Sequence, residues 1–150
     1  GLSKFNFEGG YWPASIDRIH DESVMQWFEN HVQIVQTRPR PIDYNVFSGA
    51  EDYSEPKARR LAAAGEATWA AIQNMDHHHL GACVNETSDA CKAMISGYIS
   101  DGVLPILSAM RDQHLGVKLL GAGGYGYMLV VSEQPVEGGL RVTVRRPVSM

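Results

Sequence analysis

A short segment rich in glycine, Gly121-Ala-Gly-Gly-Tyr-Gly126, constrains the fold of this chain more than any other feature. Glycine adopts positive φ without strain, so the segment predicts a tight loop. Strand-forming stretches flank it, Gly116-Val-Lys-Leu-Leu120 before and Tyr127-Met-Leu-Val-Val131 after. Leu140-Arg-Val-Thr-Val144 then alternates as a half-buried strand does. Because short turns join antiparallel strands, the end of the chain predicts an antiparallel sheet.

Helical patterns occupy the middle of the chain. The first helix begins after Ser54, a suitable N-cap, and Pro56 is tolerated in its first turn. Helical spacing predicts that one stripe of this helix faces the core, namely Leu61, Gly65, Trp69, Ile72 and Met75. The run His77-His78-His79 interrupts the pattern. A second helix is predicted from Val84 to Tyr98, and a third carries Leu104, Leu107 and Met110.

The first third of the chain has a weaker pattern. Residues 1–30 are predicted to form an irregular lead-in followed by a short helix from Ser23 to Asn30. A strand from Val32 to Thr37 ends at Arg38-Pro-Arg-Pro41, because proline removes a backbone donor and restricts its neighbours. Residues from Asp43 to Asp52 are predicted to be a loop. Together the segments predict a single α+β domain over residues 1–150, with an antiparallel sheet of about four strands packed against a layer of helices.

Composition excludes several functional classes. A net charge of −4 gives no global field that favours nucleic acid or an acidic membrane. No run approaches the roughly 18 apolar residues of a membrane span, so neither nucleic acid nor membrane is an expected partner. Cys83 and Cys91 lie about 12 Å apart along a helix, too far for a disulfide. Reduced thiols and a cytoplasmic location are therefore expected.

The glycine segment matches two known phosphate-binding patterns only in form. A dinucleotide-binding loop requires a helix directly after G-x-G-x-x-G, whereas Tyr127 here starts a strand-forming stretch. A protein-kinase glycine loop requires the catalytic motifs of a large domain downstream, and only a short stretch follows Gly126. Both interpretations are excluded by context.

The stretch Lys118-Leu-Leu-Gly-Ala-Gly-Gly-Tyr-Gly-Tyr-Met128 resembles the C-terminal glycine motif of the GHMP small-molecule kinases. Residues 38–46 are similar to a strand-exit segment of the sugar-kinase branch that includes fucokinases and heptose phosphate kinases. Residues 61–72 resemble the first long helix of that branch, and Leu80-Gly81 its helix-opening pair. The resemblance covers residues 30 to 145 and implies a ferredoxin-like arrangement.

In this family the loop lines the cleft between two domains, close to the phosphoryl donor and acceptor. The resemblance therefore implies a phosphate or substrate-cleft loop made of Lys118, Gly121, Ala122, Gly123, Gly124, Tyr125 and Gly126. Arg38 and Arg40 are further candidates for contact with a sugar or sugar phosphate, because a guanidinium suits anion binding. No residue of the chain is assigned a catalytic role. A tight turn that only packs two strands is the structural alternative for the loop.

Two departures from the family pattern limit the expected activity. Tyr125 replaces a glycine, which predicts a blocked approach or a strained backbone. The family's main ATP-binding loop, Pro-x-x-x-Gly-Leu-Ser-Ser-Ser, and its acidic base have no counterpart here. ATP and Mg²⁺ are thus expected cofactors of an intact enzyme, and neither is expected to bind tightly to this chain alone.

Two hypotheses follow. In the first, the chain is the C-terminal domain of a GHMP-type sugar kinase and its partner is the N-terminal domain. In the second, it is a non-catalytic ligand-binding or oligomerisation module, and a homodimer forms through the exposed cleft face.

Three other sets of residues have functional alternatives. Asp76 and the run His77-His78-His79, with His114 or Cys83, suggest a metal site. Consecutive helical residues point about 100° apart, however, so the three histidines do not easily converge on one ion. A solvated helix start is the simpler interpretation, and no metal is predicted. Three further basic residues have two interpretations, namely Lys57, Arg59 and Arg60. They either extend an anion site around Arg38 and Arg40 or form the solvent-exposed face of a helix. Cys83 and Cys91 are expected in the helix core, because a nucleophile requires a nearby base.

Overall fold

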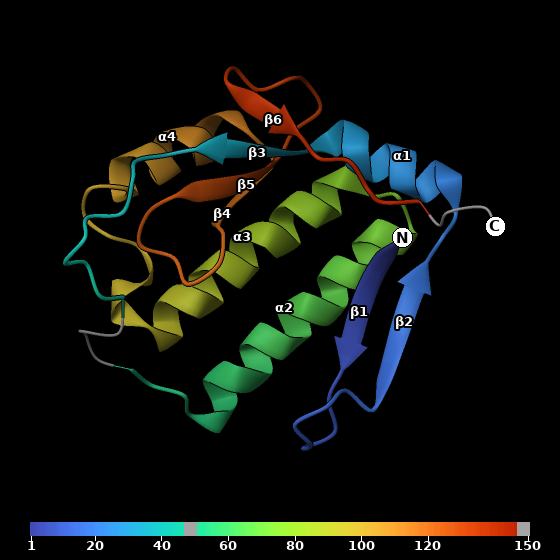
Figure 1. Cartoon of the computed structure of the whole chain (residues 1–150), viewed down its shortest axis with the longest axis horizontal. Coiled ribbons are helices and arrows are strands. Elements are labelled where there is room, and N and C mark those ends of the chain that lie inside the picture. Colours follow the sequence, from blue (N-terminus) through green and yellow to red (C-terminus); the bar gives the residue numbers. More distant parts are fainter. Residues whose placement is uncertain (47–50, 147–150) are drawn as a thin grey trace.

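The computed structural model describes residues 1–46 and 51–146, so residues 47–50 of the loop predicted between Asp43 and Asp52 lie outside the described residues. Figure 1 shows a sheet beside a pair of long helices, with a separate hairpin next to them. In chain order the elements are β1 Leu2–Asn6, β2 Ser15–Ile19, α1 Glu22–His31, β3 Val32–Gln36, α2 Glu55–Gln73, α3 His77–Met94, the 3₁₀ turn η1 Ser96–Tyr98, α4 Leu104–Gln113, β4 Gly116–Leu119, β5 Tyr127–Val131 and β6 Gly139–Arg141.

The main sheet has four strands in the order β4-β5-β3-β6, and every neighbouring pair is antiparallel. Its first strand in the chain, β3, therefore lies in the centre, which is the strand order of a ferredoxin-like sheet. The predicted α+β class and four-stranded antiparallel sheet are confirmed. β6 ends at Arg141, so the last strand is shorter than predicted and shifted toward Gly139.

Two clusters of buried side chains cover the two faces of this sheet, since successive strand residues point to opposite faces. One face presents Val117, Leu119, Met128 and Val130, which pack with Tyr98 of η1 and with Val103 and Leu107 at α4. The other face presents Val32 and Val131, which pack with Ile72 of α2 and with Leu80 and Val84 of α3. The third predicted helix is thus confirmed as α4, with Leu107 toward the core.

Helix α2 begins after Ser54 as predicted, but it buries a different stripe. Gly65 and Met75 are exposed, whereas Ala64, Ala71 and Ile72 are buried. The reason is that α2 lies side by side with α3 (Figure 1), and small alanine side chains allow the two helices to approach closely. The predicted stripe was therefore wrong at two of its five positions.

Helix α3 begins at His77, seven residues before the predicted start at Val84, and ends at Met94 instead of Tyr98. The Asp76 carboxylate caps it by accepting a hydrogen bond from the backbone N–H of His79 at 2.9 Å. The histidine run is therefore the first turn of the helix and does not interrupt the pattern. Cys83 and Cys91 both lie in α3 as free thiols, and burial raises the pKa of Cys83, which does not suit a nucleophile.

Helix α3 packs backbone against backbone on the edge strand β4. A Cβ atom on Gly116 would lie 2.3 Å from the carbonyl oxygen of Gly81, and one on Gly81 would lie 2.6 Å from the backbone of Leu115. The Asn85 side chain binds the same strand, since it donates to the carbonyl of Leu115 and accepts from the N–H of Val117. Only glycine fits both positions of this contact.

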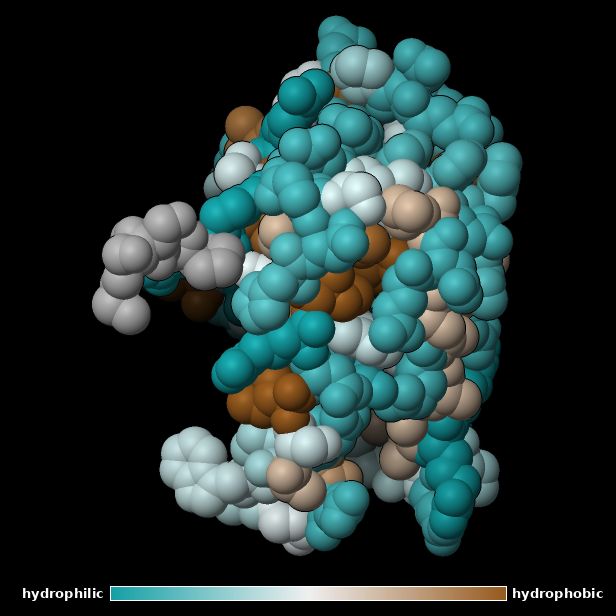
Figure 2. All heavy atoms as spheres, turned by 90° about the vertical axis from the view of Figure 1, so that its right-hand side faces the viewer, coloured by the Kyte–Doolittle hydropathy of each residue, from teal (hydrophilic) through white to brown (hydrophobic). Residues whose placement is uncertain are grey.

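The first twenty residues contradict the prediction of an irregular lead-in. β1 and β2 form a separate antiparallel hairpin, with Leu2 opposite Ile19 and Asn6 opposite Ser15. The predicted short helix after it is confirmed as α1, capped by Asp21. Figure 2 shows the face that carries α1 and the hairpin: hydrophilic side chains cover most of it and hydrophobic ones form small patches. None of the helices in residues 1–46 and 51–146 combines the length and apolar content that a bilayer crossing requires.

Candidate functional site

The glycine loop joins the edge strand β4 to β5 and depends on glycine at four positions. Gly121, Gly123, Gly124 and Gly126 have φ values of 61°, 80°, 80° and 102°, in the region that other residues rarely adopt. Two of these positions are also closely packed. A Cβ on Gly123 would lie 2.4 Å from Tyr98, and a Cβ on Gly124 would lie 2.3 Å from the ring of Tyr44.

Hydrogen bonds hold the loop in this conformation. The N–H of Gly124 donates to the carbonyl of Tyr98 at 2.7 Å, and the N–H of Gly126 donates to the carbonyl of Arg38 at 3.0 Å. The N–H groups of Gly123 and Tyr125 also bond within the loop. Among the described residues, the amides of Gly121 and Ala122 make no backbone hydrogen bond, so they are the two loop donors that a ligand can use.

Tyr125 occupies its position without the backbone strain that the sequence predicted. Within the described chain, the only non-glycine residue with positive φ is Met75. The ring of Tyr125 packs edge-on against Tyr44, with the ring centroids 4.9 Å apart, and its hydroxyl lies beside Gly102. The side chain therefore forms part of the wall of the loop.

A groove with a volume of about 530 Å³ lies on the outer side of the loop. Its wall is mainly apolar, and it contains one charged side chain. The residues around it are Ile34, Arg40, Leu120, Gly121, Ala122, Tyr125, Gly126, Tyr127 and Leu140. Tyr127 and Leu140 are large hydrophobic residues that remain exposed here. The groove thus combines a single cation, two unpaired amides and an apolar floor.

The two predicted arginines have different positions. The Arg40 guanidinium donates to the carbonyl of Gly123 at 2.8 Å and lines the groove. Arg38 contributes its backbone carbonyl to the loop, while its side chain is exposed. Of the two arginines, only Arg40 places its charged side chain against the glycine loop.

Lys118 precedes the loop but turns away from the groove. Its ammonium donates to the hydroxyl of Tyr98 at 2.8 Å and to the carbonyl of Leu119 at 3.2 Å. Burial lowers the pKa of Lys118, while burial raises the pKa of Tyr98. Tyr98 in turn donates to the carbonyl of Leu119 at 2.6 Å. Lys118 therefore stabilises the end of β4, where the loop begins, and does not line the groove.

The remaining basic candidates lie on the surface of α2. Their partners are acidic residues of α2, of α3 and of the segment before α2: Lys57 pairs with Asp52, Arg59 with Glu55 and Arg60 with Glu86. Each of them is paired with a carboxylate, and none lines the groove that contains Arg40.

A second hollow of about 350 Å³ lies on the other side of Tyr125. Tyr44 and Tyr125 line it together with polar residues around η1, including Ser100 and Asp101. The hydroxyl of Ser100 donates to the carbonyl of Gly124 at 2.7 Å. Tyr125 of the loop thus lines both hollows, an arrangement that the sequence did not reveal because Tyr44 and Ser100 come from distant segments.

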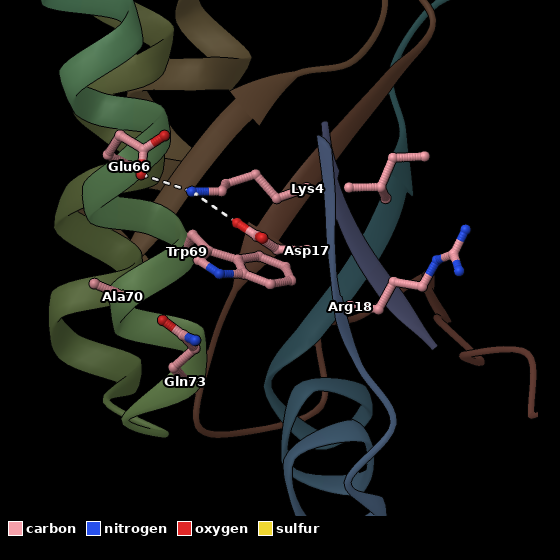
Figure 3. Close-up of a pocket in the computed structure, with 8 residues that line it drawn as sticks. Lys4, Asp17, Arg18, Glu66, Trp69, Ala70 and Gln73 are labelled. Atoms are coloured by element: carbon pink, nitrogen blue, oxygen red, sulfur yellow. Dashed lines mark hydrogen bonds and ion pairs between the residues drawn. The ribbon is translucent and has the colours of Figure 1, made fainter. Parts of the chain in front are cut away.

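A further hollow of about 650 Å³ lies between the hairpin and α2 and was also missed by sequence reasoning. Figure 3 shows Lys4 of β1 extending toward Glu66 of α2 and Asp17 of β2, with the Trp69 ring beside them. Lys4 lies 2.8 Å from Glu66 and 3.3 Å from Asp17, so its charge is already neutralised within the protein. Because Lys4 is already paired with both carboxylates of the lining, this hollow is a weaker candidate for an anion site than the groove beside the loop.

Comparison with known proteins gives a limited relationship. No protein-family model matches the chain. A stretch of 65 residues is 38% identical to L-fucokinase/L-fucose-1-P guanylyltransferase from Bacteroides fragilis, and this stretch covers 43% of the chain. It covers 7% of that protein, so the match spans a small part of the relative. The match relates part of this chain to a sugar kinase.

Proposed function

We propose that this chain is the C-terminal domain of a GHMP-type sugar kinase and that the groove beside the glycine loop lines the cleft where a sugar or sugar phosphate binds. The observation that carries the proposal is the loop itself, with four glycines at positive φ and an unbonded pair of amides at Gly121 and Ala122 beside Arg40. The partial match to a fucokinase agrees with this proposal. The family assignment depends on the resemblance of residues 118–128 to the family motif.

In an intact enzyme of this kind, the γ-phosphoryl group of ATP is transferred to a sugar hydroxyl with Mg²⁺, largely by positioning and electrostatics. The residues of this chain supply positioning only. Arg40 and the amides of Gly121 and Ala122 would hold an anionic oxygen, while Tyr127 and Leu140 would contact the apolar face of a sugar or the other domain. The main ATP loop and the acidic base would come from another domain.

Titration of the ¹⁵N-labelled chain followed by NMR tests the proposal, with L-fucose 1-phosphate and Mg-ATP added separately. We expect the amide signals of Gly121 and Ala122 to shift with the sugar phosphate, in a saturable manner. Arg40→Gln should weaken binding about tenfold, because a hydrogen bond to a charged group contributes about 1.5 kcal/mol or more.

Arg59→Gln is the matched control, since Arg59 is an exposed arginine whose partner is Glu55 on α2, away from the groove. It should leave the affinity unchanged. Equal affinity of both variants, with unchanged dispersion of the amide signals, would remove the groove from the proposal.

The second candidate function is an oligomerisation module. The observation that favours it is the exposed apolar surface at the groove, where Leu140 is 60% exposed and Tyr127 is 45% exposed. Sedimentation equilibrium from micromolar to millimolar concentration tests it. Dimerisation that Leu140→Glu abolishes supports the module, whereas a monomer over the whole range eliminates homodimerisation through this face.

A further inference from the structure

The first turn of α3 and the residues after β5 bring together two histidines and a glutamate that the sequence did not connect. The Nε2 atom of His77 lies 2.9 Å from Oε1 of Glu133, and the Nε2 atom of His78 lies 3.6 Å from the same oxygen. The three ligand atoms all lie within 4.8 Å of one another. This cluster contains none of the residues of the glycine loop.

The two adjacent histidines converge although neighbouring helical positions point about 100° apart. Their imidazole rings lean toward each other, with the ring centroids 4.5 Å apart and the planes tilted by 39°. The sequence argument considered the histidine run only with Asp76, His114 and Cys83. It had no means to place Glu133, which provides the common point toward which both rings turn.

A third histidine fixes the orientation of His77. The ring of His31 stacks on that of His77 at a centroid distance of 4.9 Å and an interplanar angle of 7°. Nδ1 of His31 lies 2.8 Å from the carbonyl oxygen of Trp27, which selects the tautomer with a proton on Nδ1. The half-buried His77 is therefore held against α1 with Nε2 directed at Glu133, while His78 is exposed and free to adjust.

We propose that His77, His78 and Glu133 bind a zinc-type divalent transition metal ion through Nε2, Nε2 and Oε1. Two imidazoles and one carboxylate form a ligand set that suits Zn²⁺, whose bonds of about 2.0–2.2 Å place tetrahedral ligands about 3.3 Å apart. The two distances to Glu133, 2.9 Å and 3.6 Å, lie on either side of this value. Water completes the coordination, and the ion joins the start of α3 to the end of β5.

Two electrostatic effects oppose each other at this position. The N-terminus of α3 carries partial positive charge and disfavours a cation, whereas the carboxylate of Glu133 favours one. Asp76 adds a second negative charge at the same helix end, although its carboxylate is already engaged with the N–H of His79.

Isothermal titration calorimetry of the untagged chain with Zn²⁺ at pH 7.5 tests the proposal. We expect one ion per chain, and a loss of affinity of at least about tenfold for each of His77→Ala, His78→Ala and Glu133→Gln. Zn²⁺ should also raise the Tm of the unsubstituted chain, because it binds the folded state. Co²⁺ in place of Zn²⁺ should give visible d–d absorption, and Mg²⁺ should not bind, since it prefers oxygen ligands.

His79→Ala is the matched control. His79 is the next residue of the same histidine run, it is exposed, and its side chain does not belong to the cluster around Glu133. This variant should bind Zn²⁺ with unchanged affinity. Thermal melts without metal establish that each variant folds, and Glu133→Gln keeps the size of the side chain.

Either of two results would overturn the site. One is the absence of saturable heat with Zn²⁺ for the unsubstituted chain. The other is an equal loss of affinity for His79→Ala and His78→Ala, because it would mean that the histidine run binds metal without Glu133 and without a defined geometry.

Discussion

The two sheets of this chain contact the helices in different ways. In the main sheet, β4 lies directly against α3 through Gly116 and Gly81, and the valines that face the helices are fully buried. The β1–β2 hairpin adds Leu2 and Ile19 to the cluster around Ile72 and contacts α2 through the charged group of Lys4, while Tyr11 and Trp12 near its tip are 88% and 77% exposed. The main sheet is closely packed against the helices, whereas the hairpin combines apolar contact at its open end with an exposed ion pair.

This difference predicts how each region responds to substitution. A closely packed interior cannot accept an added atom without a shift of backbone or side chains. Exposed ion pairs contribute little, and salt screens them. Effects should therefore decrease from the α3–β4 contact, through the glycine loop, to the hairpin.

The largest effect is expected for Gly116→Ala. Its Cβ would lie 2.3 Å from the carbonyl oxygen of Gly81, a backbone atom that cannot rotate away. We expect the free energy of unfolding in urea to fall by about 3 kcal/mol or more. Gly65→Ala is the control, since no atom lies within 4 Å of its added Cβ on α2, and it should be neutral or stabilising by up to about 1 kcal/mol. Similar values for the two variants would contradict the close α3–β4 contact.

The next effect separates two glycines of the loop. Gly124→Ala combines positive φ with a Cβ that would lie 2.3 Å from the Tyr44 ring, so we expect a loss of about 2–3 kcal/mol. Gly121→Ala has positive φ but open space around the Cβ, so the loss should be about 1 kcal/mol. Chemical denaturation of both proteins measures the difference. A larger loss of unfolding free energy for Gly121→Ala than for Gly124→Ala would show that packing on Tyr44 does not hold the loop in place.

A pH-dependent effect is expected where α4 meets the end of β5. Burial lowers the pKa of His114, whose ring lies 3.3 Å from the hydroxyl of Ser132. The unfolded chain therefore binds this proton more readily, so the stability that His114 contributes is complete above about pH 6.5 and is lost as the pH falls through its folded pKa. His114→Gln should flatten the dependence of unfolding free energy on pH between 7 and 5. An unchanged slope would assign that dependence to other groups.

The smallest effect is expected in the hairpin. Lys4→Met removes the contacts to Glu66 and Asp17 and keeps the length of the side chain. We expect a Tm slightly below that of the unsubstituted chain in low salt, and no difference in high salt, where exposed charges are screened. A large loss that persists in high salt would show that the hairpin is held as firmly as the main sheet.

Part of the candidate site follows from the sequence. The run of glycines between two strand-forming stretches predicted the loop and its position, because positive φ is a local property of the residue. The same pattern could not show that Arg40 lines the groove while Lys118 turns to Tyr98, since strand alternation does not locate a residue 20 positions away. The hairpin gave little signal, since Leu2–Asn6 does not alternate apolar and polar residues, whereas α3 had a signal in Asp76 as an N-cap.

Local residue patterns were sufficient to predict the strands beside the loop, the helix after Ser54 and the loop itself. Which surfaces meet depends on the packing of whole elements. The contact of Gly81 with Gly116 joins a helix to a strand 35 positions later, and the convergence of His77 and His78 depends on Glu133 at the end of a different element. The spacing of residues along the chain reveals the periodicity of helices and strands. These contacts between distant segments depend instead on how whole elements pack.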